Sequence, residues 1–348
     1  MSDDRRRPGQ HESRRDQALG RWIADEVHPF CEPVRGQLER AGLGRRDLRT
    51  AADLARLPVT ELADLGDGRR HVLEPTAERI RDSAGIGLRG RLLAADVLGR
   101  RDGFARHDID AAFKPVRWTA DPHPAGTLFT GSTATDLERL AALGRRALAI
   151  SGVTPSDRVV CTSEAVGVGA LQLELGARDA GVAHLVLDAA DGRLIEAASP
   201  TVLAGTAATL ERAVDAGLPT SVRMLIVHLG STGGGELRGL RRRSGRPVRL
   251  WWAPAGVRAA WATCEADHLH TWPEHEHVEV VDDAGQPTDS GRLVWSAVGW
   301  RGSVWLRVAL GPQGRVDRSE CACGRTTPRV LGAARAPRRA PATAGSRP

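Results

Sequence analysis

Three cysteines and a histidine in the last third of the chain could hold a metal ion. Cys321-Ala322-Cys323-Gly324 places two thiols on one turn, and Cys264 and the segment His268-Leu269-His270 lie upstream. Three thiolates and one imidazole form a complete tetrahedral set for Zn²⁺, and a site closed by four protein ligands is structural. The alternative is two exposed thiols beside an unrelated buried Cys264, because a Cys-x-Cys pair strains simultaneous ligation more than Cys-x-x-Cys.

A glycine-rich turn is the second feature that could bind a ligand. Ser231-Thr232-Gly233-Gly234-Gly235-Glu236 follows an apolar strand that we expect to end at Val227. In open α/β sheets ligands lie at such turns, because the backbone can approach them closely. The turn is no Walker A motif, since no Gly-Lys-Ser/Thr ends it. A loop with flexible glycines and no ligand is the alternative interpretation.

The composition limits the chemistry that the chain can perform. Its 348 residues, 41% of them apolar, suffice for one large α/β domain or two ordinary ones. The chain has no Tyr and a single Lys, Lys114, so no other lysine can form a Schiff base or bind phosphate. Five cysteines, an odd and sparse number, argue against a disulfide framework.

The net charge of +6 lies mainly in the two ends of the chain. Residues 1–16 carry five Arg and four acids, and residues 331–348 carry four Arg and no acid, which leaves about +1 for residues 17–330. This is a weak electrostatic case for a nucleic-acid partner. Both ends lack apolar periodicity and are predicted to be disordered. No apolar run approaches the roughly 20 residues of a membrane span and no signal peptide is recognisable, so we expect a cytoplasmic protein with no membrane partner.

The elements that must position these residues alternate along the chain. Residues 17–56 are predicted to be helical, and Thr135-Asp136-Leu137-Glu138 resembles a capping box that opens a helix ending at Gly152. Further strands are expected at residues 158–160, 184–187, 201–204 and 223–227, and helices at 169–180, 193–198 and 207–216. Short apolar strands that alternate with helices indicate a buried, largely parallel sheet.

The pattern changes after residue 247. Short alternating strands at 278–282, 291–295 and 303–306, separated by Gly, Pro and Asp, predict a small antiparallel subdomain. We therefore expect an α/β fold with an α/β part over 17–247 and a β-rich part with the metal site over 248–330.

The order of these features resembles the large N-terminal domain of phenylacetate-CoA ligases, in the adenylate-forming (AMP-binding) superfamily. The segments that carry the resemblance are 41–43, 53–60, 136–159, 269–274, 278–282, 291–294 and 320–330. The resemblance implies stacked α/β subdomains plus a small antiparallel β subdomain, and a structural zinc held by Cys264, His270, Cys321 and Cys323. Such enzymes activate a carboxylate with ATP and transfer the acyl group to coenzyme A.

The motifs for that chemistry are eroded in this sequence. The phosphate loop would occupy Ala120–Thr127, where two prolines remove donors, Asp121 adds like charge and the usual lysine is missing. The adenine and Mg²⁺ motif would fall at Trp252–Gly256, where Trp252 can stack but the carboxylate is gone. The ribose motif would fall at Arg307–Pro312 and has lost its Asp. Only Gly234-Gly235-Glu236 resembles the family's Gly-Gly-Glu-Pro turn near the adenine.

We therefore expect a catalytically impaired, lid-less member of this group that acts as a binding or interaction protein for a small carboxylate, a nucleotide or a protein. ATP, AMP and Mg²⁺ are not expected as firm cofactors. The alternative is an atypical ATP-dependent acyl-CoA ligase that receives its lid in trans. A nucleic-acid partner of the Arg-rich tail is a third, weaker interpretation.

Overall fold

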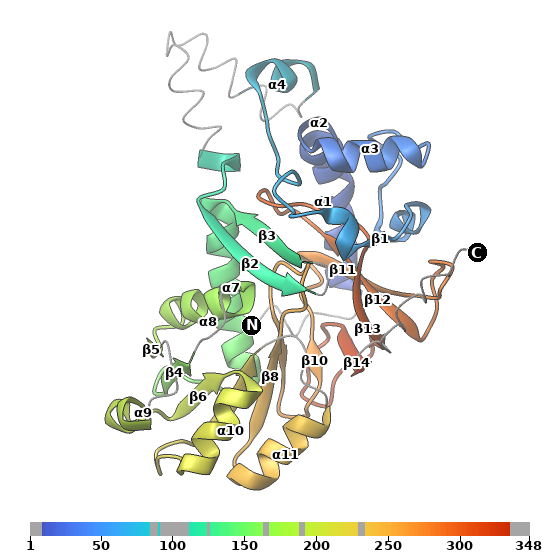
Figure 1. Ribbon diagram of the computed structural model, residues 1–348. Coiled ribbons are helices and arrows are strands. Elements are labelled where there is room, and N and C mark those ends of the chain that lie inside the picture. Colours follow the sequence, from blue (N-terminus) through green and yellow to red (C-terminus); the bar gives the residue numbers. More distant parts are fainter. Residues whose placement is uncertain are drawn as a thin grey trace, which may run out of the picture.

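Short helices form the amino-terminal part of the protein (Figure 1). The computed structural model describes residues 9–83, 90, 111–123, 126–162, 167–187, 192–228 and 234–334. The first elements are α1 (Gln10–Trp22), η2 (Ile23–Val27), α2 (His28–Phe30), α3 (Glu32–Arg40), η3 (Ala51–Arg56), β1 (Thr60–Glu61), η4 (Leu62–Leu65) and α4 (Ala77–Ser83). The expected helical character of residues 17–56 is confirmed for most of that stretch.

Helix α1 corrects the prediction of a disordered segment over residues 1–16. Residues 10–16 are helical and residues 1–8 lie outside the described part. A distant partner holds this polar helix in place, because His11 is buried and its Nδ1 lies 2.7 Å from Glu274 Oε1. Local apolar periodicity could not reveal such a contact.

A hairpin and a long helix follow. The hairpin is formed by β2 (Arg117–His123) and β3 (Gly126–Ser132), and the helix is α7 (Ala134–Ser151). The helix is confirmed, and Gly152 ends it at φ 87°. The capping box lies two residues earlier than predicted: Thr133 is the N-cap and Asp136 returns the hydrogen bond. Asp136 is preferred to Glu138 because its carboxylate is also held by the backbone of the 301–302 segment.

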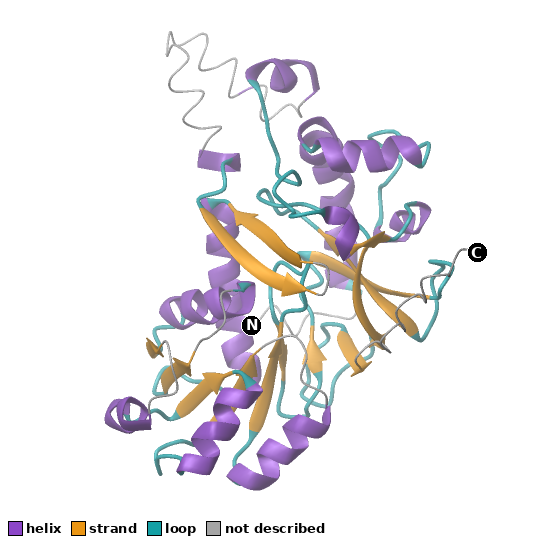
Figure 2. Cartoon of the chain, in the orientation of Figure 1, coloured by secondary structure: helices purple, strands orange, loops and turns teal. Residues whose placement is uncertain are grey.

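Parallel strands and helices build the central layer (Figure 2). The elements are β4 (Arg158–Thr162), α8 (Val168–Asp179), β5 (Ala183–Leu187), α9 (Gly192–Ala198), β6 (Val202–Gly205), α10 (Ala207–Ala216), β7 (Met224–His228), α11 (Gly234–Ser244) and β8 (Val248–Trp252). The strands run parallel in the order β8-β7-β6-β4-β5. This confirms the predicted parallel sheet.

Glycines let helices α7 and α8 approach closely. A Cβ on Gly144 would lie 2.3 Å from the Gln172 carbonyl oxygen, and one on Gly176 would lie 2.4 Å from the backbone of Gly144. Such distances exclude any side chain at either position. The pair α7 and α8 covers one face of the parallel strands, and helices α9, α10 and α11 cover the other with a separate apolar cluster that includes Ile195, Leu210 and Leu240.

The β-rich part continues the same sheet. Its strands are β9 (Trp261–Thr263), β10 (Leu269–His270), β11 (Glu276–Val281), β12 (Gly291–Ala297), β13 (Val308–Asp317) and β14 (Arg329–Ala334), in the order β11-β12-β13-β14-β10-β9-β8. Strand β8 pairs parallel with β7 and antiparallel with β9, so the antiparallel part begins after β8 and not at residue 248.

Two expectations for this part are corrected. The strand expected at 303–306 is not formed, because only Ser303 makes an isolated bridge, and the neighbouring strand is β13. The tail predicted for residues 331–348 is ordered as far as Ala334, since β14 pairs with β13. Residues 335–348 lie outside the described part.

Tryptophans of β8 and of the β-rich part fill the interior. The fully buried ones are Trp251, Trp261, Trp272, Trp295, Trp300 and Trp305. Two of these indoles donate to the Glu276 carboxylate, Trp261 Nε1 at 2.7 Å and Trp295 Nε1 at 2.6 Å. Burial raises the pKa of Glu276 to about 7, although these donors favour its charged form.

Candidate functional site

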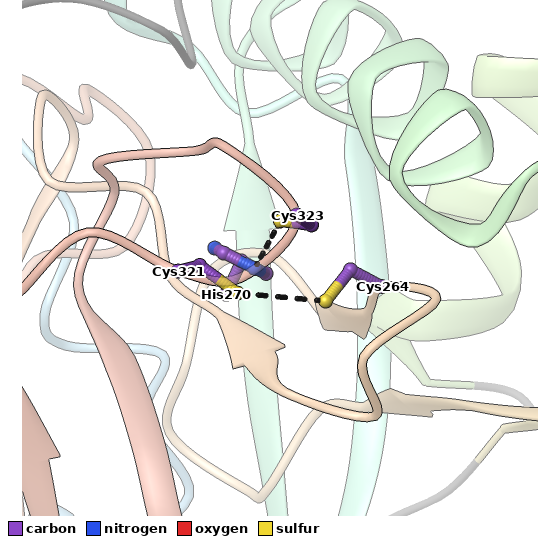
Figure 3. Close-up of side chains that lie close together, drawn as sticks. All are labelled: Cys264, His270, Cys321 and Cys323. Carbon is purple, nitrogen blue, oxygen red and sulfur yellow. Dashed lines mark hydrogen bonds between the residues drawn. The ribbon is translucent and has the colours of Figure 1, made fainter.

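Strand pairing brings the four predicted metal ligands together (Figure 3). Cys264 follows β9, His270 ends β10, and Cys321 and Cys323 lie on the turn between β13 and β14. Because β10 lies between β9 and β14 in the sheet, its two neighbours carry the thiols to either side of His270. The ligand atoms of the four residues all lie within 4.8 Å of one another.

The distances between these atoms fit a tetrahedral zinc site. Cys264 Sγ and Cys321 Sγ are 3.8 Å apart, and Cys323 Sγ and His270 Nε2 are 3.5 Å apart. With Zn–S of about 2.3 Å and Zn–N of about 2.0–2.1 Å, a tetrahedron has S···S edges of about 3.8 Å and S···N edges of about 3.5 Å. The thiols are not disulfide-bonded. The donor set therefore fits Zn²⁺ in both chemistry and spacing.

A hydrogen bond to Thr327 orients the imidazole of His270. Nδ1 of His270 lies 2.8 Å from the Thr327 hydroxyl, which leaves Nε2 directed toward Cys323. His268, the other histidine of the segment, places Nδ1 3.2 Å from Cys321 Sγ and so borders the cluster. Burial raises the pKa of Cys264 to about 12, so without a cation its thiol keeps the proton that metal binding must release.

The residues predicted to contact a nucleotide are not shown to form one site. Gly234, Gly235 and Glu236 open helix α11, and the preceding residues 229–233 lie outside the described part. Trp252 ends β8, is 6% exposed and packs edge-on against Trp261 at 5.3 Å between ring centroids. Its nucleotide role stays a prediction, and its ring is part of the core in this structure.

Most of the segment predicted to hold the phosphate loop, residues 120–127, belongs to the hairpin β2–β3, and residues 124 and 125 lie outside the described part. Strands β2 and β3 pair from Arg117 with Ser132 to His123 with Gly126. Asp121 is buried on this hairpin, its Oδ1 accepts from the Val168 amide at the start of α8 at 3.4 Å, and its Oδ2 has no partner among the described residues. Burial raises the pKa of Asp121 to about 6.

Replacing Asp121 with asparagine is expected to remove a pH dependence of stability. The unfolded carboxyl ionises near pH 4, whereas the folded protein retains its proton to about pH 6. Between these pH values the folded protein holds a proton that the unfolded chain releases, so the free energy of unfolding falls as the pH rises through 6. For a pKa raised from 3.8 to about 6, the decrease is about 3 kcal/mol. Urea unfolding at pH 4.5 and pH 8 should show D121N more stable than the wild type only at pH 8.

The exposed acid Asp283 provides the control for this measurement, and D283N should retain the wild-type profile. An equal difference between D121N and the wild type at both pH values would show that Asp121 does not titrate in this way.

A buried charge network near the hairpin was missed by sequence reasoning. Asp136 accepts from the amides of Gly302 at 2.6 Å and Arg301 at 3.1 Å, and lies 3.5 Å from Arg258. Arg258 donates to the Gly131 carbonyl at 2.8 Å, which joins the end of β3 to the loop before β9. The capping-box pattern was the only signal in the sequence, and it pointed to the wrong acid.

Two residues lie in segments predicted to hold eroded motifs. Gly256 adopts φ 98°, and a Cβ there would lie 3.1 Å from Leu62 Cδ2. Arg307 is buried and its guanidinium donates to Glu279 at 2.8 Å and to the Gly285 carbonyl at 2.8 Å. Both positions therefore serve packing in this structure.

Solved structures with the same architecture are acyl-CoA ligases. Three structures of 2-hydroxyisobutyryl-CoA ligase match this chain. An open conformation with 2-HIB-AMP and CoA has a TM-score of 0.67 and 16% sequence identity, and a postadenylation state with R3-HIB-AMP has a TM-score of 0.67 and 18% identity. A thioesterification state with 2-HIB-AMP and CoA has a TM-score of 0.66 and 17% identity. They cover 93%, 93% and 94% of this chain and 68%, 66% and 68% of their own.

The chain therefore has the fold of adenylate-forming acyl-CoA ligases over about two thirds of their length. The expected fold class is confirmed. No family model and no curated protein matches the sequence. Within the described ranges, no helix combines the length and apolar character that a bilayer crossing requires.

Proposed function

We propose that this protein is a catalytically impaired relative of adenylate-forming ligases, of the phenylacetate-CoA ligase-like group, which has kept a zinc-stabilised scaffold and acts as a binding protein. Its ligand would be a small carboxylate or nucleotide, or a protein partner. The observation that carries the proposal is the hairpin β2–β3, which contains most of the segment that the order of motifs assigns to the phosphate loop.

The hairpin supports the proposal because the N–H groups that pair its two strands are already engaged. A phosphate cradle needs free backbone N–H groups that converge on the anion. Here the strands pair with each other from Arg117 to His123. Pro122 has no N–H, and the Asp121 carboxyl takes the Val168 amide at the start of α8. An ionised Asp121 would also repel a triphosphate.

The position of the Mg²⁺ carboxylate supports it further. Gly256 takes that position by the order of motifs, and its φ of 98° is strained for any L side chain. The would-be Cβ faces Leu62, Val308 and Leu310 within 4 Å, so a carboxylate there would point into apolar packing. Without this acid a metal-assisted transfer loses a main source of charge stabilisation.

Zinc fits a structural role in this proposal. Cys264, His270, Cys321 and Cys323 would complete the coordination and leave no open position for a substrate. The ion would join β9, β10 and the β13–β14 turn. Its contribution is to hold this end of the sheet together and not to activate water.

Exchange of pyrophosphate into ATP tests the impairment. We expect no carboxylate-dependent exchange above the protein-free rate with a panel of short aliphatic and aromatic acids, with 2-hydroxyisobutyryl-CoA ligase as the positive control. Robust exchange by the purified chain would show that it is an active ligase. Thermal shift with AMP and with the same acids tests the binding role, and the absence of any shift would leave protein partners as the only ligands compatible with the proposal.

A further inference from the structure

A cysteine and a histidine meet at the carboxyl edge of the parallel strands. Cys161 lies on β4 and His228 ends β7, with β6 between them. In the strand register, Cys161 of β4 pairs with Ala204 of β6, and Ala204 pairs with Ile226 of β7. Side chains two residues apart on a strand point to the same face of the sheet, so His228 lies on the same face as Ile226 and Cys161. Cys161 Sγ and His228 Nε2 are 3.4 Å apart, and both residues are buried, at 5% and 1% exposure.

A cavity of about 310 Å³ reaches this thiol. It lies between β2, helix α8 and the edge strand β5, and Cys161 forms part of its lining. Trp118, Leu171 and Val186 make much of its wall apolar, and Trp118 is 41% exposed. Arg117, Thr119 and Glu174 also line it, so the wall is mixed in polarity.

We propose that Cys161 is a nucleophile that accepts a small apolar acyl group from an acyl thioester, with His228 as its proton acceptor. The assignment is independent of the proposed function, because it requires neither ATP nor an adenylate. A cavity of this size with Trp118, Leu171 and Val186 in its wall suits a short aliphatic or aromatic acyl group.

The transfer is a thiol–thioester exchange. Cys161 Sγ forms a bond to the acyl carbonyl carbon while its proton moves to His228 Nε2. The bond between the carbonyl carbon and the carrier sulfur then breaks, and the carrier thiolate takes the proton from His228. One thioester is consumed and one is formed, so no oxidant or reductant is required.

Cys31 offers a matched comparison within the same molecule. It is 0% exposed, and burial raises the pKa of both Cys31 and Cys161 to about 12 and lowers the pKa of His228 to about 4. The two thiols therefore differ in the neighbouring imidazole and not in their acidity. Within the described residues, no histidine forms a hydrogen bond with the Cys31 thiol. If acylation required only transient opening of the core, both thiols would react. If it requires the neighbouring histidine and the cavity, Cys161 would react faster than Cys31.

The experiment uses the full zinc-loaded chain with benzoyl-CoA as the probe and site-resolved mass spectrometry as the readout. We expect a benzoyl thioester on Cys161 that hydroxylamine removes, formed at least about tenfold faster than on Cys31. H228Q should slow the reaction on Cys161 by roughly a hundredfold, the contribution of a positioned general base, without altering that on Cys31.

Equal labelling of the two thiols, no labelling of Cys161, or an unchanged rate in H228Q would each overturn the proposal. The comparison with Cys31 needs no variant, so a failure of H228Q to fold does not prevent the test. Labelling of Cys161 together with absent pyrophosphate exchange would support both proposals separately.

Discussion

Replacing Cys321 and Cys323 with serine is expected to remove bound zinc and to unfold the β-rich end of the sheet. The two thiols supply half of the ligands, and the S···S and S···N distances fit a four-ligand site. Structural zinc contributes an apparent binding free energy of about 10–16 kcal/mol in small zinc domains. This matches or exceeds the whole stability of an ordinary domain, about 5–15 kcal/mol. Loss of the metal should therefore abolish cooperative unfolding of this part.

Metal analysis of protein purified without added metal is the measurement. The wild type should contain about one equivalent of zinc and the double variant close to none. C31S is the control, because Cys31 is a buried cysteine outside the cluster and its loss should leave the zinc content unchanged. A wild-type content below about half an equivalent, or an unchanged content in the double variant, would falsify the zinc assignment.

Replacing Asp136 with alanine is expected to cost about 3–5 kcal/mol of unfolding free energy, the range for breaking a buried charge pair. Asp136 is 0% exposed and caps α7 while it binds the amides of Arg301 and Gly302. Its removal leaves those amides unsatisfied and the buried Arg258 without its nearest acid. Burial already lowers the pKa of Arg258 to about 10, which reflects the cost of this charge in the interior.

The exposed Glu138, two residues further along the same helix, provides the matched control. E138A should change the unfolding free energy by no more than about 0.5 kcal/mol, as surface substitutions usually do. Chemical unfolding of D136A and E138A compared with the wild type decides between the two capping registers. A similar decrease in unfolding free energy in D136A and E138A would mean that the hydrogen bonds and the ion pair of Asp136 contribute little beyond a helix cap.

The helices and parallel strands were predictable because their signals are local. Residues 207–216 were predicted as a helix and form α10 with the same bounds, and the strand expected at 223–227 is β7 shifted by one residue. Amphipathic spacing and apolar runs reflect how each segment is buried, so they survive in the sequence whatever the partners are. Two predictions were wrong where residues distant in the sequence stabilise the local structure. Helix α1 is held by a contact with Glu274, and the cap of α7 is held by the backbone of residues 301–302.

The sequence by itself determined the types of ligand at the candidate metal site and the α/β order of the elements. The choice of His270 over His268 came with the family resemblance, and the tertiary structure accounts for it, because β10 lies between β9 and β14 and directs His270 Nε2 at Cys323. Only the tertiary structure paired Cys161 with His228, 67 residues apart. Neighbouring parallel strands are joined by long crossovers, so the residues that meet at their carboxyl edge carry no spacing that a sequence can show.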